Sequence, residues 1–205
     1  TSLSQVDLPE DINVLGDSMF AGCTSLEHIS IPEETVDVGN GTFFGCTSLS
    51  QVNLSKSINR IGDNTFAYCK ALENIDIPES VTTIDGFAFF GCESLTNVDL
   101  PSGLKEIGSC AFGECTSLQE IVLPESIELI DEGAFMNCTS LSKVEIPESM
   151  LSIKDEAFAG CTALKNVTIP ESAEYVSDRA FVDGVNEMTI NCYSTSSIYS
   201  ELMSS

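Results

Sequence analysis

A 23-residue period runs through this 205-residue chain and constrains its fold more than any other feature. Three residue types recur at that spacing without a slip. The cysteines are Cys23, Cys46, Cys69, Cys92, Cys115, Cys138 and Cys161. The phenylalanines run from Phe20 to Phe181 and the leucines from Leu3 to Leu164. Such a register means that one supersecondary unit is stacked on itself, so that equivalent side chains form straight rows.

Each unit contains a segment that alternates as a β-strand does. In Ile29-Ser30-Ile31 two β-branched residues flank a polar one, so the apolar pair would point inward and the serine outward. Pro32 follows and would end the strand, because proline has no N–H to donate to a ladder. Copies one period apart are expected to pair in parallel, about 4.8 Å from each other.

The second half of each unit carries another apolar pair and then a Phe three residues before the Cys. Ile127 and Ile130 form one such pair, and the stretch "AFMNC" follows. A spacing of three places Phe and Cys on one face of a short helical turn. Because few residues remain in the unit, we expect a single turn of α-helix or 3₁₀-helix there. The predicted fold class is therefore α/β.

This pattern resembles leucine-rich repeats of the 23-residue BspA-like class. The matching stretches are "LEHISIP", "LTNVDLP" and "LQEIVLP" in the strand, and "IGSCAFGEC" and "IDEGAFMNC" after it. The resemblance implies a right-handed solenoid shaped as a horseshoe, with a parallel sheet on its concave face and short helical turns on the convex side. Residues 1–186 would form about eight repeats, starting mid-repeat, and residues 187–205 would form a C-terminal cap with a strand and a short helix.

The charge balance limits the partners of this chain. It has 32 acidic and 8 basic side chains, for a formal net charge of -24. A polyanion is repelled by nucleic acid and by anionic membranes, and no apolar run approaches the roughly 20 residues that span a bilayer. We therefore expect no nucleic-acid binding and no membrane insertion.

The N-terminal end is expected to be an open edge of the stack. The chain begins inside a repeat and shows no signal-peptide pattern, so we expect further sequence upstream. Leu3, Val6 and Leu8 would then lie against a preceding repeat or a neighbouring molecule. The expected state is a monomer or a weak end-to-end association.

Nine cysteines allow more than one interpretation. In the repeated row they would be buried thiols that fill space and donate weakly. Adjacent coils are close enough for disulfides, and a Cys110–Cys115 bond is a second possibility, but thiols of one row point the same way. A metal site lacks support, since there is no C-x-x-C pair and His28 is the single histidine. We expect Cys192 to be buried and Cys110 to be the most accessible thiol.

Outward-facing strand positions supply the candidate binding face, which the resemblance places on the concave side. It consists of His28, Ser30, Gln51, Asn53, Asn74, Asp76, Asn97, Asp99, Glu120, Lys143 and Glu145. These positions vary while the buried strand positions repeat the same residue types, which favours a recognition surface. The alternative interpretation is that exposed strand positions are polar only because they face solvent. Exposed aromatic anchors are nearly missing from this face, so a polar protein or carbohydrate partner is the expectation.

A second stripe of acidic residues follows the prolines. It comprises Glu10, Glu33, Glu79, Glu125, Glu148 and Glu171. A solvated edge that resists sheet-to-sheet aggregation is one interpretation. Loose binding of Ca²⁺ is the other, because carboxylates are its ligands.

The sequence contains few residues that could form a catalytic site. The lone His28 cannot complete a Ser-His-Asp or Cys-His site with another histidine, and an open sheet offers no water-excluding pocket. We expect no enzyme activity and no cofactor. The resemblance implies a protein-interaction and adhesion module that is secreted or displayed on the cell surface. The alternative is a structural spacer that presents another domain and has no ligand of its own.

Overall fold

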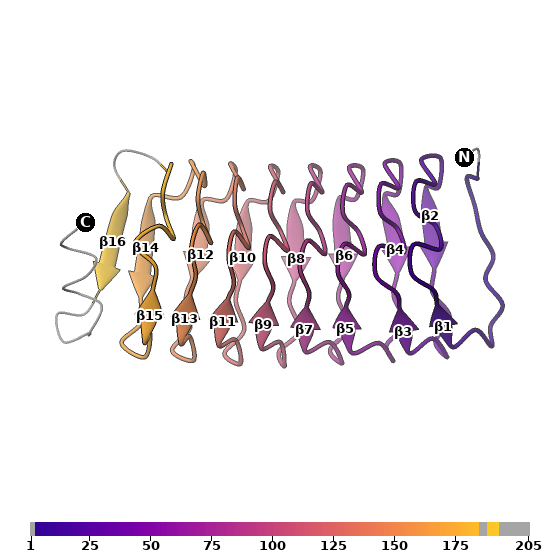
Figure 1. Cartoon of the computed structure of the whole chain (residues 1–205), viewed down its shortest axis with the longest axis horizontal. Helices are drawn as coiled ribbons and strands as arrows, with labels where there is room; N and C mark the ends of the chain where they lie inside the picture. Colours follow the sequence, from indigo (N-terminus) through magenta and orange to yellow (C-terminus); the bar gives the residue numbers. More distant parts are fainter. Residues whose placement is uncertain (1–2, 185–187, 193–205) are drawn as a thin grey trace.

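The computed structural model describes residues 3–184 and 188–192, which form a solenoid of stacked coils. In Figure 1 the chain rises in front, turns over at the top and descends behind while it advances from right to left, so the coil is right-handed. Paired strands are offset by 23 residues, so one sequence repeat makes one coil. The described residues contain strands and turns, and no helix there is long and apolar enough to cross a membrane.

One row of strands is formed by the predicted segments before the prolines. Its members are β2 (His28–Ser30), β4 (Gln51–Asn53), β6 (Asn74–Asp76), β8 (Asn97–Asp99), β10 (Glu120–Val122), β12 (Lys143–Glu145), β14 (Asn166–Ile169) and β16 (Thr189–Cys192). They pair in parallel as β2–β4, β6–β8, β10–β12 and β14–β16, and the ladder is interrupted between these pairs. We call the outer surface of this row the strand face.

A second row of two-residue strands lies on the other side of the coils (Figure 1). Its members are β1 (Val14–Leu15), β3 (Asp37–Val38), β5 (Arg60–Ile61), β7 (Thr83–Ile84), β9 (Glu106–Ile107), β11 (Leu129–Ile130), β13 (Ser152–Ile153) and β15 (Tyr175–Val176). β5 to β15 form one continuous parallel sheet of six strands, and β1 pairs with β3. The second residue of each of these strands is buried, which is why the sequence repeats an apolar residue there.

The expected helical turn before each cysteine is wrong. The backbone N–H groups of Cys110, Phe112 and Glu114 donate to carbonyl oxygens one coil further on, at 2.7–2.8 Å. The N–H groups between them donate to the residue three positions earlier. Cys110 and Glu114 also have positive φ angles of 54° and 58°, whereas a right-handed helix needs negative φ throughout. The segment is therefore a series of single hydrogen-bonded turns whose alternate N–H groups are hydrogen-bonded to the next coil.

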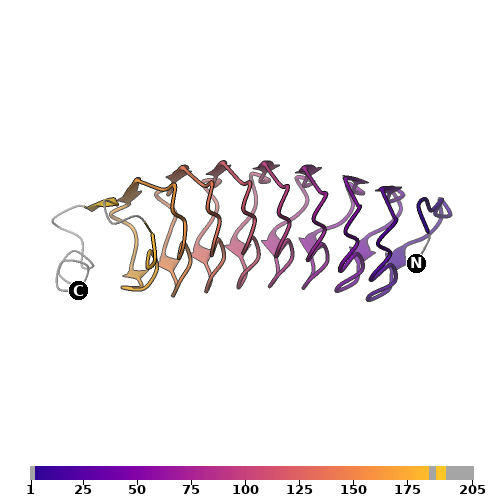
Figure 2. The same ribbon diagram turned by 90° about the horizontal axis from the view of Figure 1, so that it is seen from above.

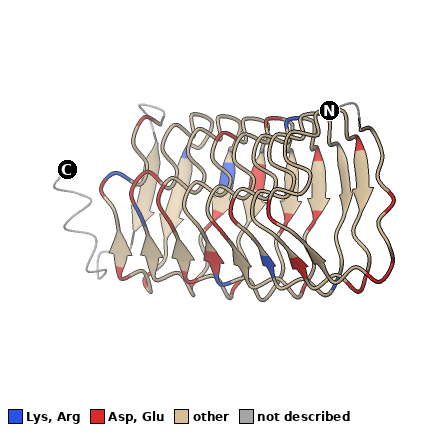
Figure 3. Ribbon diagram, turned by 45° about the vertical axis from the view of Figure 1, so that its right-hand side comes forward, with Lys and Arg blue, Asp and Glu red and all other residues tan. Residues whose placement is uncertain are grey.

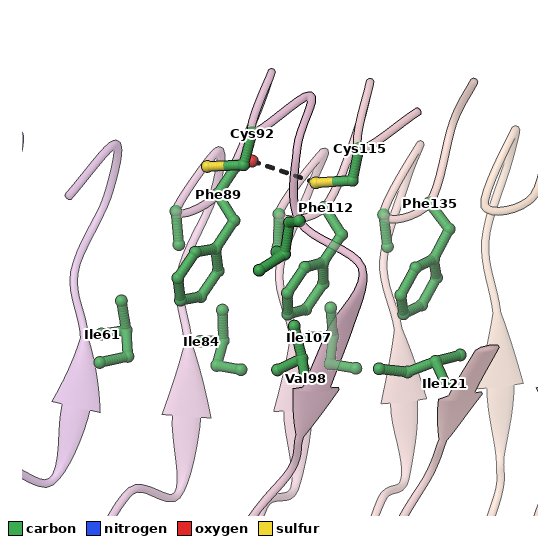
Figure 4. Packing of buried hydrophobic residues seen from close by; sticks show 14 of the residues in the cluster. Ile61, Ile84, Phe89, Cys92, Val98, Ile107, Phe112, Cys115, Ile121 and Phe135 are labelled. Atoms are coloured by element: carbon green, nitrogen blue, oxygen red, sulfur yellow. Dashed lines mark hydrogen bonds between the residues drawn. The ribbon is translucent and has the colours of Figure 1, made fainter. Parts of the chain in front are cut away.

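The predicted phenylalanine row is confirmed as the centre of the core. The ring centroid of Phe112 lies 5.1 Å from that of Phe89 and 5.4 Å from that of Phe135, and the ring planes are within 6° of parallel. Rings from Phe43 to Phe158 are fully buried. Figure 4 shows these rings above the isoleucines of the strands and below the cysteines. Burial of this row, together with the buried leucines and isoleucines, holds one coil on the next.

The stack is nearly straight. Figure 2 shows only a slight bow along its length, so the strand face is close to flat and does not line a deep horseshoe. A horseshoe arises when one side of each coil is wider than the other. Here the side expected to hold helices consists of turns that are hydrogen-bonded from coil to coil, and it stacks as tightly as a sheet.

The two ends only partly match the expectations. β16 pairs with β14 as the predicted last strand, but Cys192 is half-buried and not fully buried as expected. The predicted C-terminal helix and the predicted boundary at residues 186 and 187 lie outside the described residues. At the other end, Leu3 is 40% exposed, whereas Val6 and Leu8 pack partly against the core.

Candidate binding surfaces

The strand face carries all eleven predicted site residues. In each three-residue strand from β2 to β12 the middle residue is buried and both flanking residues are exposed. This follows from strand alternation, since the middle side chain packs on the phenylalanine row and its neighbours point to solvent. The predicted residues therefore form two rows of exposed side chains along the stack. The register pairs place them side by side, coil to coil.

Few of these side chains satisfy one another. The Asn53 amide Nδ2 donates to the Ser30 hydroxyl at 3.0 Å. The Lys143 ammonium lies 2.8 Å from a Glu145 carboxylate oxygen, which raises the pKa of Lys143 and lowers that of Glu145 through their hydrogen bond. Both groups are exposed to solvent, so the pair adds little to stability. The Asn97 amide donates to the hydroxyl of its neighbour Thr96 at 3.4 Å. Because these side chains are exposed, a ligand can reach them in place of water.

Two like charges are placed directly opposite each other on this face. Asp76 of β6 and Asp99 of β8 are register partners, as are the amides Asn74 and Asn97. Opposed carboxylates on neighbouring strands repel each other. A partner that donates hydrogen bonds or carries positive charge would relieve that repulsion on binding.

Shallow depressions lie where the ladder of the strand face is interrupted. One, of about 540 Å³, lies between β8 and β10 and is lined by Asn97, Asp99, Glu120 and Val122 among others. Another, of about 430 Å³, lies between β4 and β6. Val122 is 68% exposed, and it is the apolar residue in an otherwise polar row. The face thus offers separate recesses rather than one enclosed pocket.

The acidic stripe at the edge of the coils interacts with neighbouring backbone. A Glu79 carboxylate oxygen accepts hydrogen bonds from the Ser102 N–H and hydroxyl, at 3.1 and 2.8 Å. Glu33 accepts one from the Lys56 N–H at 3.3 Å. Within residues 3–184 and 188–192, no group of three or more His, Cys, Asp or Glu side chains is arranged to hold a metal ion. Figure 3 shows acidic residues distributed along the strands and edges with few basic ones among them.

The buried thiols have a more definite role than space filling. The Cys115 thiol lies 3.3 Å from the Phe89 carbonyl oxygen of the preceding coil, and Cys92 makes the same contact with Phe66. The dashed line in Figure 4 marks the first of these bonds. Each thiol thus donates to a carbonyl that would otherwise be less well satisfied in the core. Burial raises the pKa of Cys161 to about 12, so the thiol stays protonated and does not serve as a nucleophile.

All nine cysteines are free, so the possible Cys110–Cys115 disulfide is not formed. Cys110 is partly exposed, as predicted, and Cys192 shares that property. Burial raises the pKa of Cys110 as well, which makes it a weak nucleophile at neutral pH.

A cluster of exposed aromatic side chains on the turns was not predicted from the sequence. We call Phe44, Tyr68, Phe87 and Phe90 the aromatic patch. Successive ring centroids, in the order Phe44, Tyr68, Phe90 and Phe87, are 5.5, 5.6 and 5.5 Å apart. Phe44, Tyr68 and Phe87 are 41%, 37% and 39% exposed. Three neighbouring coils therefore share one apolar surface away from the strand face.

The sequence did contain a signal for this patch. Tyr68 occupies a column that otherwise reads Gly22, Gly45, Gly91, Glu114, Asn137, Gly160 and Asp183. All members of that column have positive φ. A tyrosine among glycines, asparagine and acids at a left-handed position is an outlier that costs on the order of 1 kcal/mol or more. Comparing the columns for such outliers would have found it.

The comparison with protein families agrees with the geometry. The family model of the BspA type leucine rich repeat region matches residues 1–98 and 82–203, in six copies. The chain belongs to this family. A comparison with curated proteins finds no match.

Solved structures of several bacterial proteins share this solenoid. A protein from Bacteroides ovatus is 21% identical with a TM-score of 0.70, over 92% of this chain and 56% of its own length. The leucine-rich repeat protein TpLRR of T. pallidum is 30% identical with a TM-score of 0.58, over 84% and 70%. The pneumococcal vaccine antigen PcpA is 20% identical with a TM-score of 0.52, over 90% and 61%. The chain thus spans little more than half of the Bacteroides ovatus protein.

Proposed function

We propose that this chain is a non-catalytic interaction module that is secreted or displayed on the cell surface and binds a protein or carbohydrate partner through the strand face. The observation that supports this most is the division of the strands: each middle residue is buried in the core, while the residues on either side are exposed and vary along the stack. The exposed rows are free to change without disturbing the stack.

The chemistry of the strand face suits a polar and extended partner. Its side chains are mainly Asn, Gln, Asp and Glu, and the aligned pair Asp76 and Asp99 favours a ligand with hydrogen-bond donors. The recesses at the ladder interruptions give such a ligand places to insert hydroxyl or amino groups. Membership of the BspA type repeat family, and a fold shared with a pneumococcal vaccine antigen, are in keeping with a location outside the cell.

A structural spacer is the second candidate function. The six-stranded sheet from β5 to β15 and the stacked rings from Phe20 to Phe181 both run along the stack without interruption. These contacts make the solenoid stiff along its axis, as a spacer requires. A spacer would have no need for a particular set of exposed side chains.

A binding experiment with matched variants distinguishes the binding module from the spacer. The chain would be tested on arrays of glycans and of extracellular-matrix proteins, together with a variant carrying Asp76→Ala and Asp99→Ala. The control carries Glu106→Ala and Glu128→Ala, which remove the same charge from exposed positions around the short strands. A binding module should lose its ligand in the first variant and keep it in the second. Absence of any ligand on both arrays, or equal binding by both variants, would count against recognition by the strand face.

A further inference from the structure

Two residues of the aromatic patch lie at backbone positions where bulky side chains are strained. Tyr68 and Phe87 have φ angles of 61° and 57°, in the left-handed region. The column of Phe87 otherwise holds Ser18, Gly41, Asn64, Cys110, Gly133, Glu156 and Arg179. Bulky residues at positive φ are strained, and such strain is concentrated at functional sites.

Two rings of the patch, Tyr68 and Phe90, lie on glycines of the next coil. A Cβ atom added to Gly91 would lie 2.8 Å from the Tyr68 Cδ1 atom, and one added to Gly113 would lie 2.8 Å from the Phe90 Cδ2 atom. The glycines therefore give these two rings room to lie close to the backbone, with other parts of the rings turned to solvent. The core does not need them, because the buried row of phenylalanines already fills each coil.

The charges around the patch are negative once the ion pairs are counted. Asp63 lines a depression of about 280 Å³ together with Phe44, Asn40 and Asn64. Glu114 follows Gly113, the glycine that lies against the Phe90 ring. The Glu114 carboxylate is also near enough to Lys70 to help raise the pKa of its ammonium group. The Lys70 ammonium is itself paired with the Glu93 carboxylate at 2.6 Å. Lys70 is thus already paired, as is Arg60 with Asp85, and Asp63 and Glu114 add negative charge beside the patch.

The faces of the aromatic rings attract cations as well. The chain uses that attraction elsewhere, where the Lys154 ammonium lies 4.8 Å from the centroid of the Tyr175 ring. In the described part of the chain, no Lys or Arg is placed over a ring of the aromatic patch in that way. The patch therefore has both carboxylates and ring faces to offer to a positively charged group.

We propose that the aromatic patch is a second binding surface, which takes a basic peptide segment of a partner protein, with Arg or Lys beside apolar residues. The net charge of -24 attracts such a segment at long range. A second copy of the chain does not fit, because it carries the same charge. Four partly exposed rings also offer only on the order of 300 Å², below the roughly 800 Å² per partner of a standard protein interface.

The test uses short random peptides displayed on phage, selected on the whole chain and depleted on a variant with Tyr68→Gly and Phe87→Asn. Glycine and asparagine are the residues that other coils carry in these columns, so the variant should fold with an unchanged or higher Tm. Recovered peptides should be rich in Arg and Lys next to apolar residues. Fluorescence anisotropy should show them binding the variant at least about tenfold more weakly, and binding wild type less tightly in high salt.

Other outcomes would overturn the proposal. A fall in the Tm of the variant by several degrees would show that the rings serve the stability of the stack. Neutral or acidic peptides, or equal binding by both proteins, would remove the role assigned to the patch. Loss of binding to a neutral glycan instead would make the patch a carbohydrate site. The strand-face variant with Asp76→Ala and Asp99→Ala should bind the peptides as wild type does, so this test and that of the strand face fail separately.

Discussion

Raising the pH should unfold this protein over a narrow range above pH 9, because the column of thiols cannot ionise inside the core. Burial raises the pKa of Cys46 from its ordinary value of 9.0 to about 11, and that of Cys161 to about 12. It also holds the pKa well above the ordinary value for Cys69, Cys92, Cys115 and Cys138. A thiolate in one coil would in addition repel its neighbour in the next, since the thiols form one row.

The size of the effect follows from the difference in protonation between the folded and unfolded chains. Below pH 9 both states hold these protons, so the full stability is present. Above pH 9 the unfolded chain releases them and the folded chain keeps them, which favours unfolding by about 1.4 kcal/mol per pH unit for each thiol. Six thiols together give roughly 8 kcal/mol per pH unit, while a domain is stable by about 5–15 kcal/mol. Stability should therefore be exhausted within about two pH units above pH 9, below the folded pKa of Cys161.

Urea unfolding followed by circular dichroism, in reducing buffers from about pH 7 to 11, measures this slope. The control variant replaces Cys69, Cys92, Cys115 and Cys138 by alanine, which cannot ionise. It should be less stable at neutral pH, because each change removes a buried sulfur and a hydrogen bond, but its stability should fall only about one third as steeply above pH 9. The reasoning is refuted if thiols of the buried row, as distinct from the partly exposed Cys110 and Cys192, ionise near pH 9 while the native spectrum persists. An unchanged slope in the variant would refute it equally.

Three further expectations concern the core, the thiols and the turns. Phe112→Ala should lower the free energy of unfolding in urea by about 4 kcal/mol, because the ring is fully buried between two others. Phe20→Ala should lower it clearly less, since that ring has one stacked neighbour. Equal losses would contradict the role of the row. Cys110 should react with a maleimide in the native protein before any thiol of the buried row, as mass spectrometry of the labelled peptides would show. Gly160→Ala should lower the Tm by several degrees, because φ is +70° there and a methyl group would collide with the Asn137 side chain; an unchanged Tm would show that the turn adapts.

Much of the fold could be predicted because the repeat fixes neighbours without any knowledge of the local backbone. Once Phe89 and Phe112 occupy equivalent positions in consecutive coils, their stacking follows, and so does the exposure of Asn97 and Asp99 on either side of a buried Val98. The 23-residue period determines which side chains lie next to each other in consecutive coils. It does not determine how the backbone turns between the strands.

The turns were predicted wrongly for that reason. A spacing of three between Phe112 and Cys115 fits a helix, and it fits equally a pair of turns with positive φ at Cys110 and Glu114. The choice between them depends on where the backbone N–H groups find acceptors, and here the next coil supplies every second one. Glycine and asparagine at the corresponding positions of other coils, such as Gly133 and Asn137, are the local clue.

The same bonds between coils explain how the stack tolerates the aromatic patch. The Tyr68 N–H donates to the Phe90 carbonyl oxygen at 2.7 Å and the Phe87 N–H to that of Ser109 at 2.8 Å, so the next coil holds the backbone whatever the side chain is. The strain of a left-handed tyrosine, on the order of 1 kcal/mol or more, is then offset locally and is not passed on, because a coil contacts only its neighbours. Each coil can therefore present a chosen side chain at its turns, as Glu114 also illustrates. The surface that this fold can vary for recognition thus extends beyond the strand face to the turns.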